Sequence, residues 1–216
     1  MLKEYKTLLS YGKSEVVIER SKFIGHATPV ESEEEAVAFI EKIKTEYWNA
    51  THNVPAYMVG ENNEIQRYSD DKEPSGTAGV PVLEVIKRED LKNVAVVVTR
   101  YFGGIKLGTG GLVRAYTRGA KIALEAAKII TKKLHKLVIV TTEYTISGKV
   151  QNEILQNGYL IKETKYDDAV HFYIYVGINF LERFEGQITE WTSGRCNLNF
   201  MGMEYLTEID GKITVI

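Results

Sequence analysis

Residues Val94–Lys128 read VAVVVTRYFGGIKLGTGGLVRAYTRGAKIALEAAK and contain the clearest structural pattern in the chain. Its first part, VAVVVTRYF, is mostly apolar, which predicts a strand that is buried on both faces. Glycines fill the next segment, and from Leu112 onward apolar residues return at helical spacing. The sequence therefore predicts a buried strand, a glycine-rich loop and a long helix at the centre of an α+β fold.

The segments before this stretch show both strand and helix patterns. SEVVIERSKFIGHATPV predicts two short strands that break near Arg20, and VPAYMVG with EIQRYS predicts a hairpin. Between these, SEEEAVAFIEKIKTEY predicts a helix with Ser32 as its N-cap and Glu35 at the capping-box position. VPVLEVIKRE predicts a further short helix. These elements and the central stretch form the expected first domain.

The last third of the chain carries a second pattern. Composition changes near residues 131–137, TKKLHKL, which predicts a short connection and a division into domains 1–134 and 135–216. After it come strand, helix, strand, strand, helix and strand patterns, from LVIVTTEYT to NLNFMGMEYL. This βαββαβ order predicts a ferredoxin-like C-terminal domain.

Charge is divided unevenly along the chain. Residues 31–90 contain 14 acidic and 6 basic residues, a net charge of −8, whereas residues 92–133 contain 9 basic residues and one acid, a net charge of +8. Residues 135–216 sum to −4. We therefore expect any polyanionic partner to contact the middle of the chain.

The helix after the glycine loop carries most of this positive charge. Arg114, Arg118, Lys121 and Lys128 share one face, interrupted by Glu125. Such a face favours binding of a phosphate backbone, although docking of an acidic protein surface or plain solvent exposure also fits it. The predicted nucleic-acid-binding residues are Arg100, Lys106, Arg114, Arg118 and Lys121.

The glycine loop itself is a candidate anion site. Gly108, Thr109, Gly110 and Gly111 precede a helix, where free amide groups attract anions. Known nucleotide motifs do not match, because Thr109 replaces the lysine of a P-loop and Val113 replaces the third glycine of a dinucleotide fingerprint. Tight packing of the turn is the alternative, and we predict no cofactor.

An acidic turn and a histidine form the candidate catalytic group. SDDKEPSGTAG places Asp70, Asp71 and Glu73 close together, and His52 lies in a polar, turn-like setting. Carboxylates and a histidine can act as general acid and base, but turn carboxylates also cap helices or form ion pairs. No zinc, EF-hand or GxSxG pattern is present, so we predict no metal site.

The third strand of the C-terminal domain, AVHFYIYVG, alternates apolar and aromatic residues. This alternation predicts that Tyr173 and Tyr175 lie on the open side of the sheet, where aromatic rings stack bases in RNA-recognition domains. A protein-docking face, or no function, fits the pattern as well, since tyrosine is a good strand former.

The overall composition is that of a globular protein. The chain has 216 residues, of which 44% are hydrophobic and 26% charged. No apolar run approaches the roughly 20 residues that span a bilayer. Cys196 is the only cysteine and cannot form an internal disulfide, which favours a cytoplasmic protein.

Three segments of this sequence together resemble the IMPACT family, which includes YigZ-like bacterial proteins. They are THNVPAYMVG, SDDKEPSGTAGVPVL and VVVTRYFGGIKLGTGGLVRAY, in this order. The resemblance implies that the N-terminal domain is like the second domain of a small-subunit ribosomal protein and that the C-terminal domain is like the last domain of elongation factor G. It also implies a link to translation, because eukaryotic relatives compete for the activator of an initiation-factor kinase.

Two functions remain open at this point. The sequence favours a translation-linked regulator that binds RNA, ribosome-associated surfaces, translation factors or another protein partner. The alternative is a hydrolase or phosphotransferase that acts on a phosphorylated small molecule through His52 and the Asp70, Asp71 and Glu73 turn. This alternative requires that these side chains meet the glycine loop in one pocket.

Overall fold

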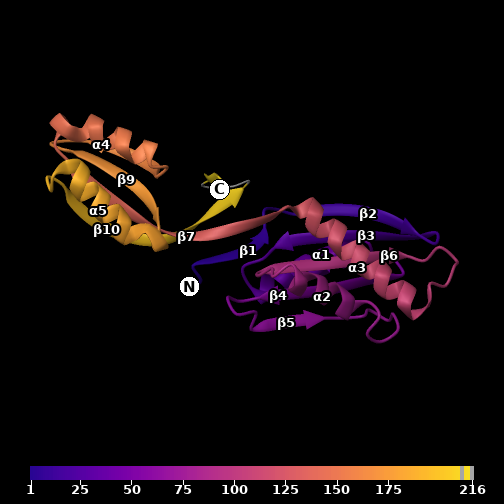
Figure 1. Cartoon of the computed structure of the whole chain (residues 1–216). Helices are drawn as coiled ribbons and strands as arrows, with labels where there is room; N and C mark the ends of the chain where they lie inside the picture. Colours follow the sequence, from indigo (N-terminus) through magenta and orange to yellow (C-terminus); the bar gives the residue numbers. More distant parts are fainter. Residues whose placement is uncertain (210–211, 215–216) are drawn as a thin grey trace. The chain divides into compact units, whose positions relative to one another are not determined.

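A computed structural model describes residues 1–209 and 212–214, which form two compact units (Figure 1). The N-terminal unit contains Met1 and residues Tyr5–Thr131, and the C-terminal unit contains Leu2–Glu4 and Lys132–Ile216. The division between the units falls after Thr131, within the predicted connection at residues 131–137, and strand β7 (Ile129–Thr142) runs through this segment. Residue 134, the expected domain boundary, lies inside this strand.

The N-terminal unit contains an antiparallel sheet of five strands in the order β2-β3-β6-β4-β5. The predicted strand β6 lies at its centre, and the predicted hairpin is formed by β4 and β5. The strands are β2 (Gly12–Ile18), β3 (Ser21–Pro29), β4 (His52–Val59), β5 (Ile65–Tyr68) and β6 (Val94–Tyr101), and β1 (Glu4–Leu8) precedes them.

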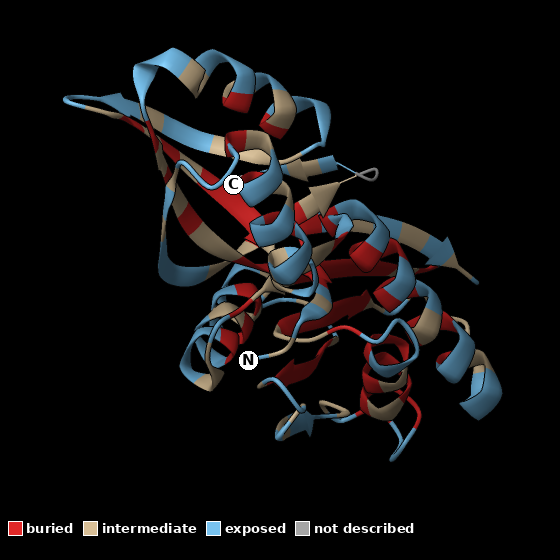
Figure 2. Ribbon diagram, turned by 60° about the vertical axis from the view of Figure 1, so that its left-hand side comes forward, coloured by how far each residue is buried: buried red, intermediate tan, exposed pale blue. Residues whose placement is uncertain are grey.

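Helices cover both faces of this sheet. They are α1 (Glu33–Glu46), α2 (Gly79–Arg88) and α3 (Gly108–Ala127). Val94, Val96 and Val98 of β6 pack with residues of α2 and α3, whereas Ala95 and Val97 pack with residues of α1. Successive strand residues point to opposite faces, so β6 is buried on both, as predicted. Figure 2 shows the buried residues on the strands and on the inner sides of the helices.

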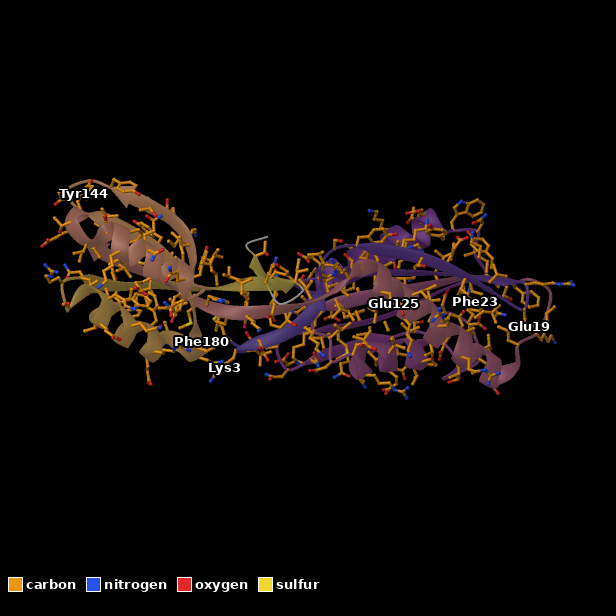
Figure 3. All side chains as sticks on the ribbon, turned by 45° about the horizontal axis from the view of Figure 1, so that its top comes forward. Lys3, Glu19, Phe23, Glu125, Tyr144 and Phe180 are labelled. Atoms are coloured by element: carbon orange, nitrogen blue, oxygen red, sulfur yellow. The ribbon has the colours of Figure 1, made fainter. Side chains whose placement is uncertain are left out.

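Local signals in the sequence account for several element ends. Ser32 Oγ accepts a hydrogen bond from the Glu35 amide at 3.2 Å, which confirms the predicted N-cap of α1. The Glu35 carboxylate accepts from the amide of Glu31 rather than that of Ser32. Glu19 and Arg20 both adopt positive φ at the β2–β3 turn, and Figure 3 labels Glu19 there.

Helix α3 begins at Gly108 rather than at Leu112, so the predicted glycine loop forms its first turn. Glycine is a poor residue for helix interiors, which is why the local pattern predicts a later start. Leu107 packs against the core of the N-terminal unit and fixes the start of the helix in spite of the glycines. The helix ends at Ala127, where Lys128 has a φ of 64°.

Two glycines let α3 lie directly on the sheet. A Cβ atom on Gly25 of β3 would overlap the carbonyl oxygen of Gly119, and a Cβ on Gly119 would lie 2.7 Å from Val98 Cγ1. The helix and the two strands therefore approach more closely than any side chain allows. This contact holds the inner face of α3 against the sheet and turns its other face to solvent.

The C-terminal unit has the predicted βαββαβ order. After β7 come α4 (Tyr144–Gln156), β8 (Leu160–Tyr166), β9 (Val170–Gly177), α5 (Leu181–Thr192) and β10 (Asn197–Ile209), followed by a short strand β11 (Lys212–Thr214). The strand order is β11-β10-β7-β9-β8. Buried residues of α4 and α5 pack on Phe172 and Ile174 of β9, so both helices cover the same face.

The chain is therefore a two-domain α+β protein, as predicted. Among the helices in residues 1–209, none is long and apolar enough to cross a membrane. The likeness of the N-terminal unit to a ribosomal-protein domain stays a prediction.

Candidate functional site

A pocket of about 440 Å³ lies in the N-terminal unit where β6 ends and α3 begins. Its lining comes from segments that are far apart in sequence. The polar and charged lining residues are Thr51, His52, Glu73, Arg100, Lys106, Gly108 and Thr109, and the apolar ones are Pro74, Phe102, Leu107 and Leu112. The structure therefore brings His52 and Glu73 together with the first turn of α3.

Glu73 is the centre of the buried part of this pocket. Its Oε1 accepts hydrogen bonds from Arg100 Nη1 at 2.6 Å and from Tyr116 OH at 2.7 Å, and it lies 3.6 Å from His52 Nε2. Glu73 is 8% exposed and Arg100 is 5% exposed. Burial, and then the bond to Glu73, raise the pKa of Tyr116 far above its usual value. The positive charge of Arg100 thus compensates the buried carboxylate of Glu73, and Arg100 and Tyr116 provide the hydrogen bonds that water would otherwise make.

Arg100 is held between two aromatic rings. Its guanidinium carbon lies 5.5 Å from the centroid of the Phe23 ring and 5.4 Å from that of Phe102. Within the described ranges, Arg100 Nε has no hydrogen-bond acceptor, although it is buried. Arg100 is among the predicted nucleic-acid-binding residues, but its side chain is buried and its charge is paired with Glu73 inside the pocket, so it is not available to a phosphate backbone on the surface.

The backbone sets the tautomer of His52. Its Nδ1 lies 2.7 Å from the carbonyl oxygen of Asp71, which can only accept a hydrogen bond. Nδ1 therefore carries the proton, and in the neutral ring Nε2 has a free lone pair beside Glu73. His52 can accept a proton at Nε2, and the carboxylate of Glu73 would stabilise the resulting imidazolium.

Asp70 has a structural task. Its carboxylate accepts hydrogen bonds from the amides of Gly76 at 2.9 Å, Ala78 at 3.1 Å and Gly79 at 2.8 Å, so it caps the start of α2. These amides would otherwise have no acceptor at the helix end. Asp70 does not line the pocket.

Asp71 is also committed to the backbone. Its Oδ2 accepts from the amide of Asn53 at 2.5 Å, and its carbonyl oxygen orients His52. Of the acidic turn, only Glu73 lines the pocket. The enzyme alternative requires that all four side chains share one pocket with the glycine segment. His52 and Glu73 do so, whereas Asp70 and Asp71 do not.

The first turn of α3 offers free backbone donors to the pocket. Its N-cap, Leu107, provides no side-chain hydrogen bond to the helix, and Gly108 has a φ of 69°. The first amides of a helix have no intrahelical acceptor and carry the positive end of its dipole. Gly108 and Thr109 therefore supply an anion-attracting edge, with the exposed Lys106 beside them.

Three of the remaining predicted cations lie on the outer face of α3, and Lys106 precedes the helix. Arg114, Arg118 and Lys121 are exposed, as are Lys106 and Lys128. None of them forms an ion pair within 4.0 Å with any residue that the structure describes. Glu125, which Figure 3 labels, is the acid of this helix. The outer face of α3 thus carries uncompensated positive charge.

The proposed stacking face of the C-terminal sheet is wrong for one of its tyrosines. Tyr175 is 2% exposed, and Lys162 Nζ lies 5.3 Å from its ring centroid. Tyr173 is partly exposed, but Lys165 Nζ lies 4.7 Å from its ring centroid. Lysines on the neighbouring strand β8 therefore lie over both rings, and a base cannot stack on Tyr175 in this arrangement.

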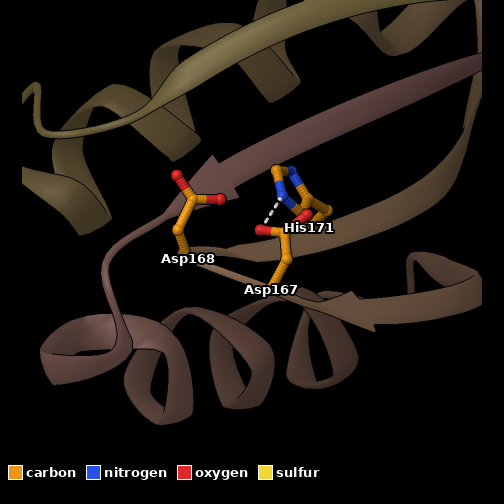
Figure 4. Close-up of side chains that lie close together, drawn as sticks. All are labelled: Asp167, Asp168 and His171. Carbon is orange, nitrogen blue, oxygen red and sulfur yellow. Dashed lines mark hydrogen bonds and ion pairs between the residues drawn. The ribbon is translucent and has the colours of Figure 1, made fainter.

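A group of three side chains at the turn between β8 and β9 has no counterpart among the predicted sites. Figure 4 shows Asp167, Asp168 and His171, with His171 Nε2 2.9 Å from Asp167 Oδ1. The amide of Ala169 and then His171 lower the pKa of Asp167 to about 2. Thr141 Oγ1 lies 2.9 Å from His171 Nδ1. These bonds account for the cluster as part of the turn.

The fold and the pocket together define a class of two-domain α+β protein in which a glycine-rich turn joins a buried strand to a cationic helix. Residues 19–124 match the model of the Impact N-terminal domain, and residues 140–195 match a domain of unknown function, DUF1949. The IMPACT family member YvyE of Bacillus subtilis is 46% identical over 206 residues, which cover 95% of each chain. The chain therefore belongs to the IMPACT family, as the sequence motifs indicated.

Two further comparisons extend this result. An IMPACT homolog of Dictyostelium discoideum is 36% identical over 101 residues, which cover 45% of this chain and 29% of that protein. A crystal structure of a hypothetical protein has a TM-score of 0.59 and 26% identity, and covers 94% of this chain and 99% of its own. The whole two-domain fold thus occurs in an experimentally solved relative.

Proposed function

We propose that this protein is a cytoplasmic, translation-linked regulator that binds RNA, free or on the ribosome, through the outer face of α3. The observation that carries the proposal is the exposure of Arg114, Arg118 and Lys121 without acidic partners in the described chain. Their spacing places them along one side of the helix, where each can contact a phosphate. Membership of the IMPACT family supports the link to translation, because the motifs resemble those of translational regulators.

Binding of this kind has a measurable dependence on salt. Lysine and arginine release counterions when they contact phosphates, so affinity falls as the salt concentration rises. The residues of the outer face would provide affinity without reading bases, since phosphate contacts carry no sequence information. A partner protein on the ribosome could be contacted by the same face only if its surface were acidic.

Replacing Arg118 and Lys121 by glutamine should weaken binding of a fluorescent RNA hairpin and reduce its salt dependence. We expect the slope of log K against log salt to fall by about 0.7–0.9 for each phosphate that the variant no longer neutralises. Glutamine has a similar helix propensity and stays polar without the charge, so the fold should be unchanged. Fluorescence anisotropy at several salt concentrations measures both quantities.

Lys42→Gln is the matched control, because Lys42 is an exposed lysine on α1, which covers the other face of the sheet. It should leave the binding and the slope unchanged. The proposal is wrong if the wild-type protein shows no salt-dependent binding to RNA or ribosomes, or if Lys42→Gln weakens binding as much as the replacement of Arg118 and Lys121 does.

The geometry of His52 supports a second candidate, an enzyme that acts on a phosphorylated small molecule. A histidine with a fixed tautomer, a free Nε2 and a nearby carboxylate is suited to general acid–base catalysis. Release of phosphate from a panel of phosphate monoesters would test it. If the pocket is catalytic, His52→Gln should reduce turnover by about 100-fold or more. Equal turnover by wild type and His52→Gln would exclude this role.

A further inference from the structure

The pocket at the start of α3 combines polar and apolar lining groups. Lys106 and the amides of Gly108 and Thr109 provide positive charge and backbone donors. Phe102, which is 47% exposed, provides an aromatic surface. A volume of about 440 Å³ admits a small molecule of moderate size. A ligand that fits both parts must carry an anion and a flat or apolar group.

The polar part suits a phosphate with two negative charges. The first amides of α3 have no side-chain cap, and Lys106 adds a flexible cation beside them. The carboxylate of Glu73 does not oppose such a ligand, because its charge is already compensated by Arg100 at 2.6 Å.

Arg100 gives an observation that is independent of the helix end. It is 5% exposed, it lines the pocket, and its Nε–H has no acceptor in residues 1–209 and 212–214. Buried donors without an acceptor are uncommon in folded proteins. The pocket is therefore lined by a guanidinium whose hydrogen-bonding capacity the described protein groups do not use up, which favours a ligand that carries acceptor oxygens.

The apolar part suits a planar ring. Phe102 has the Arg100 guanidinium 5.4 Å from its ring centroid, and a large part of the side chain remains accessible. Leu107 and Leu112 add apolar surface. Nucleobases stack on aromatic side chains in single-strand-binding proteins whatever their sequence. A phosphate and a stacked base joined by a ribose form a nucleotide.

We propose that this pocket binds a nucleotide that carries a terminal phosphate monoester, with the phosphate at Lys106 and the first turn of α3 and the base against Phe102. The ligand is either a free nucleoside monophosphate or the phosphorylated end of an RNA chain. The site rests on the pocket alone and not on RNA binding by the outer face of α3. A dinucleotide or triphosphate is not expected, because one lysine and one helix end serve a single phosphate.

Isothermal titration of the full chain tests the proposal with three kinds of probe: the four nucleoside 5′-monophosphates, the corresponding nucleosides, and inorganic phosphate. At least one nucleoside monophosphate should bind tenfold or more tightly than both its nucleoside and inorganic phosphate. Lys106→Ala and Phe102→Ala should each weaken that binding about tenfold. Both side chains are exposed, so both variants should fold.

Lys121→Gln is the control, because Lys121 lies on α3 but does not line the pocket. It should leave nucleotide binding unchanged even where it weakens RNA binding, which separates the two sites. The proposal is wrong if no monophosphate binds at millimolar concentration, if the nucleoside or phosphate binds equally well, or if Lys106→Ala and Phe102→Ala have no effect.

Short RNA oligonucleotides with a 5′-phosphate or a 5′-hydroxyl identify the source of the nucleotide. If the 5′-phosphorylated oligonucleotide displaces a bound monophosphate and the 5′-hydroxyl oligonucleotide does not, the phosphorylated end of an RNA chain is supported as the ligand. Binding of the monophosphate without displacement by either oligonucleotide supports a free nucleotide. Equal displacement by both oligonucleotides would overturn the role of the terminal phosphate.

Discussion

Replacing Glu73 by alanine should lower the free energy of unfolding of the N-terminal unit by about 3–5 kcal/mol. The carboxylate is nearly inaccessible to solvent and accepts hydrogen bonds from Arg100 and Tyr116. Its removal leaves the guanidinium of Arg100 buried without a counter-charge and the hydroxyl of Tyr116 without its acceptor. An uncompensated buried charge is among the largest penalties that one substitution can cause.

Denaturant unfolding followed by a probe in the N-terminal unit measures this effect. Glu84→Ala on α2 is the matched control, since it removes a carboxylate that pairs with Lys87 at 3.4 Å but remains 46% exposed. We expect the control to change stability by less than about 1 kcal/mol. Comparable losses in the two variants would show that the Glu73–Arg100 pair does not hold the pocket together.

Acidification from pH 6.5 to pH 4 should destabilise the N-terminal unit through His26. This histidine is 0% exposed, and burial is the main cause that lowers its pKa from 6.5 to about 4, with a smaller effect of Lys13 in the same direction and of Glu46 in the opposite one. The folded state holds the neutral ring, whereas the unfolded chain takes up a proton near pH 6.5. The free energy of unfolding therefore has its full value, as far as His26 is concerned, above pH 6.5. It decreases as the pH falls towards 4 and below, by about 3 kcal/mol in total.

The matched variant is His26→Phe. It keeps a ring among Tyr11 and Tyr47, which lie at ring distances of 6.3 Å and 4.9 Å from His26, and it removes the titrating group. The free energy of unfolding of the variant should depend less on pH than that of the wild type, because the contribution of His26 is missing. This holds whatever the stability of the variant at neutral pH. Chemical denaturation at pH 4, 5, 6 and 7 gives this slope. Parallel curves for the variant and the wild type would contradict the assignment.

Much of the fold follows from the sequence because it rests on local signals. The apolar run of β6, the Ser32 cap and the βαββαβ order of the C-terminal unit all lie within short stretches. The predicted start of α3 is wrong because glycine propensity argues against a helix there, while the packing of Leu107 on the core decides it. Tertiary contacts of this kind cannot be seen in the local pattern.

The candidate site can be predicted only in part for the same reason. Residue type alone points to His52, Glu73 and the Gly108 segment, and the fold brings them into one pocket. Arg100 resembles a surface cation in sequence, but it directly follows the apolar run of a strand that is buried on both faces, and that position is the signal that its charge needs an internal partner. Tyr116 lies within the apolar face of its helix and gives no separate signal for a bond to Glu73.

The contact between Gly25 and Gly119 has a consequence for how this protein can change over generations. Any substitution at these two glycines would push the backbone of the helix away from the strands, because a single methyl group already overlaps their neighbours. The half of α3 that meets the sheet is therefore closed to variation. Within α3, new ligand preferences can arise only on the outward half and at the first turn, where Arg118, Lys121 and Thr109 can be exchanged without disturbing the interior.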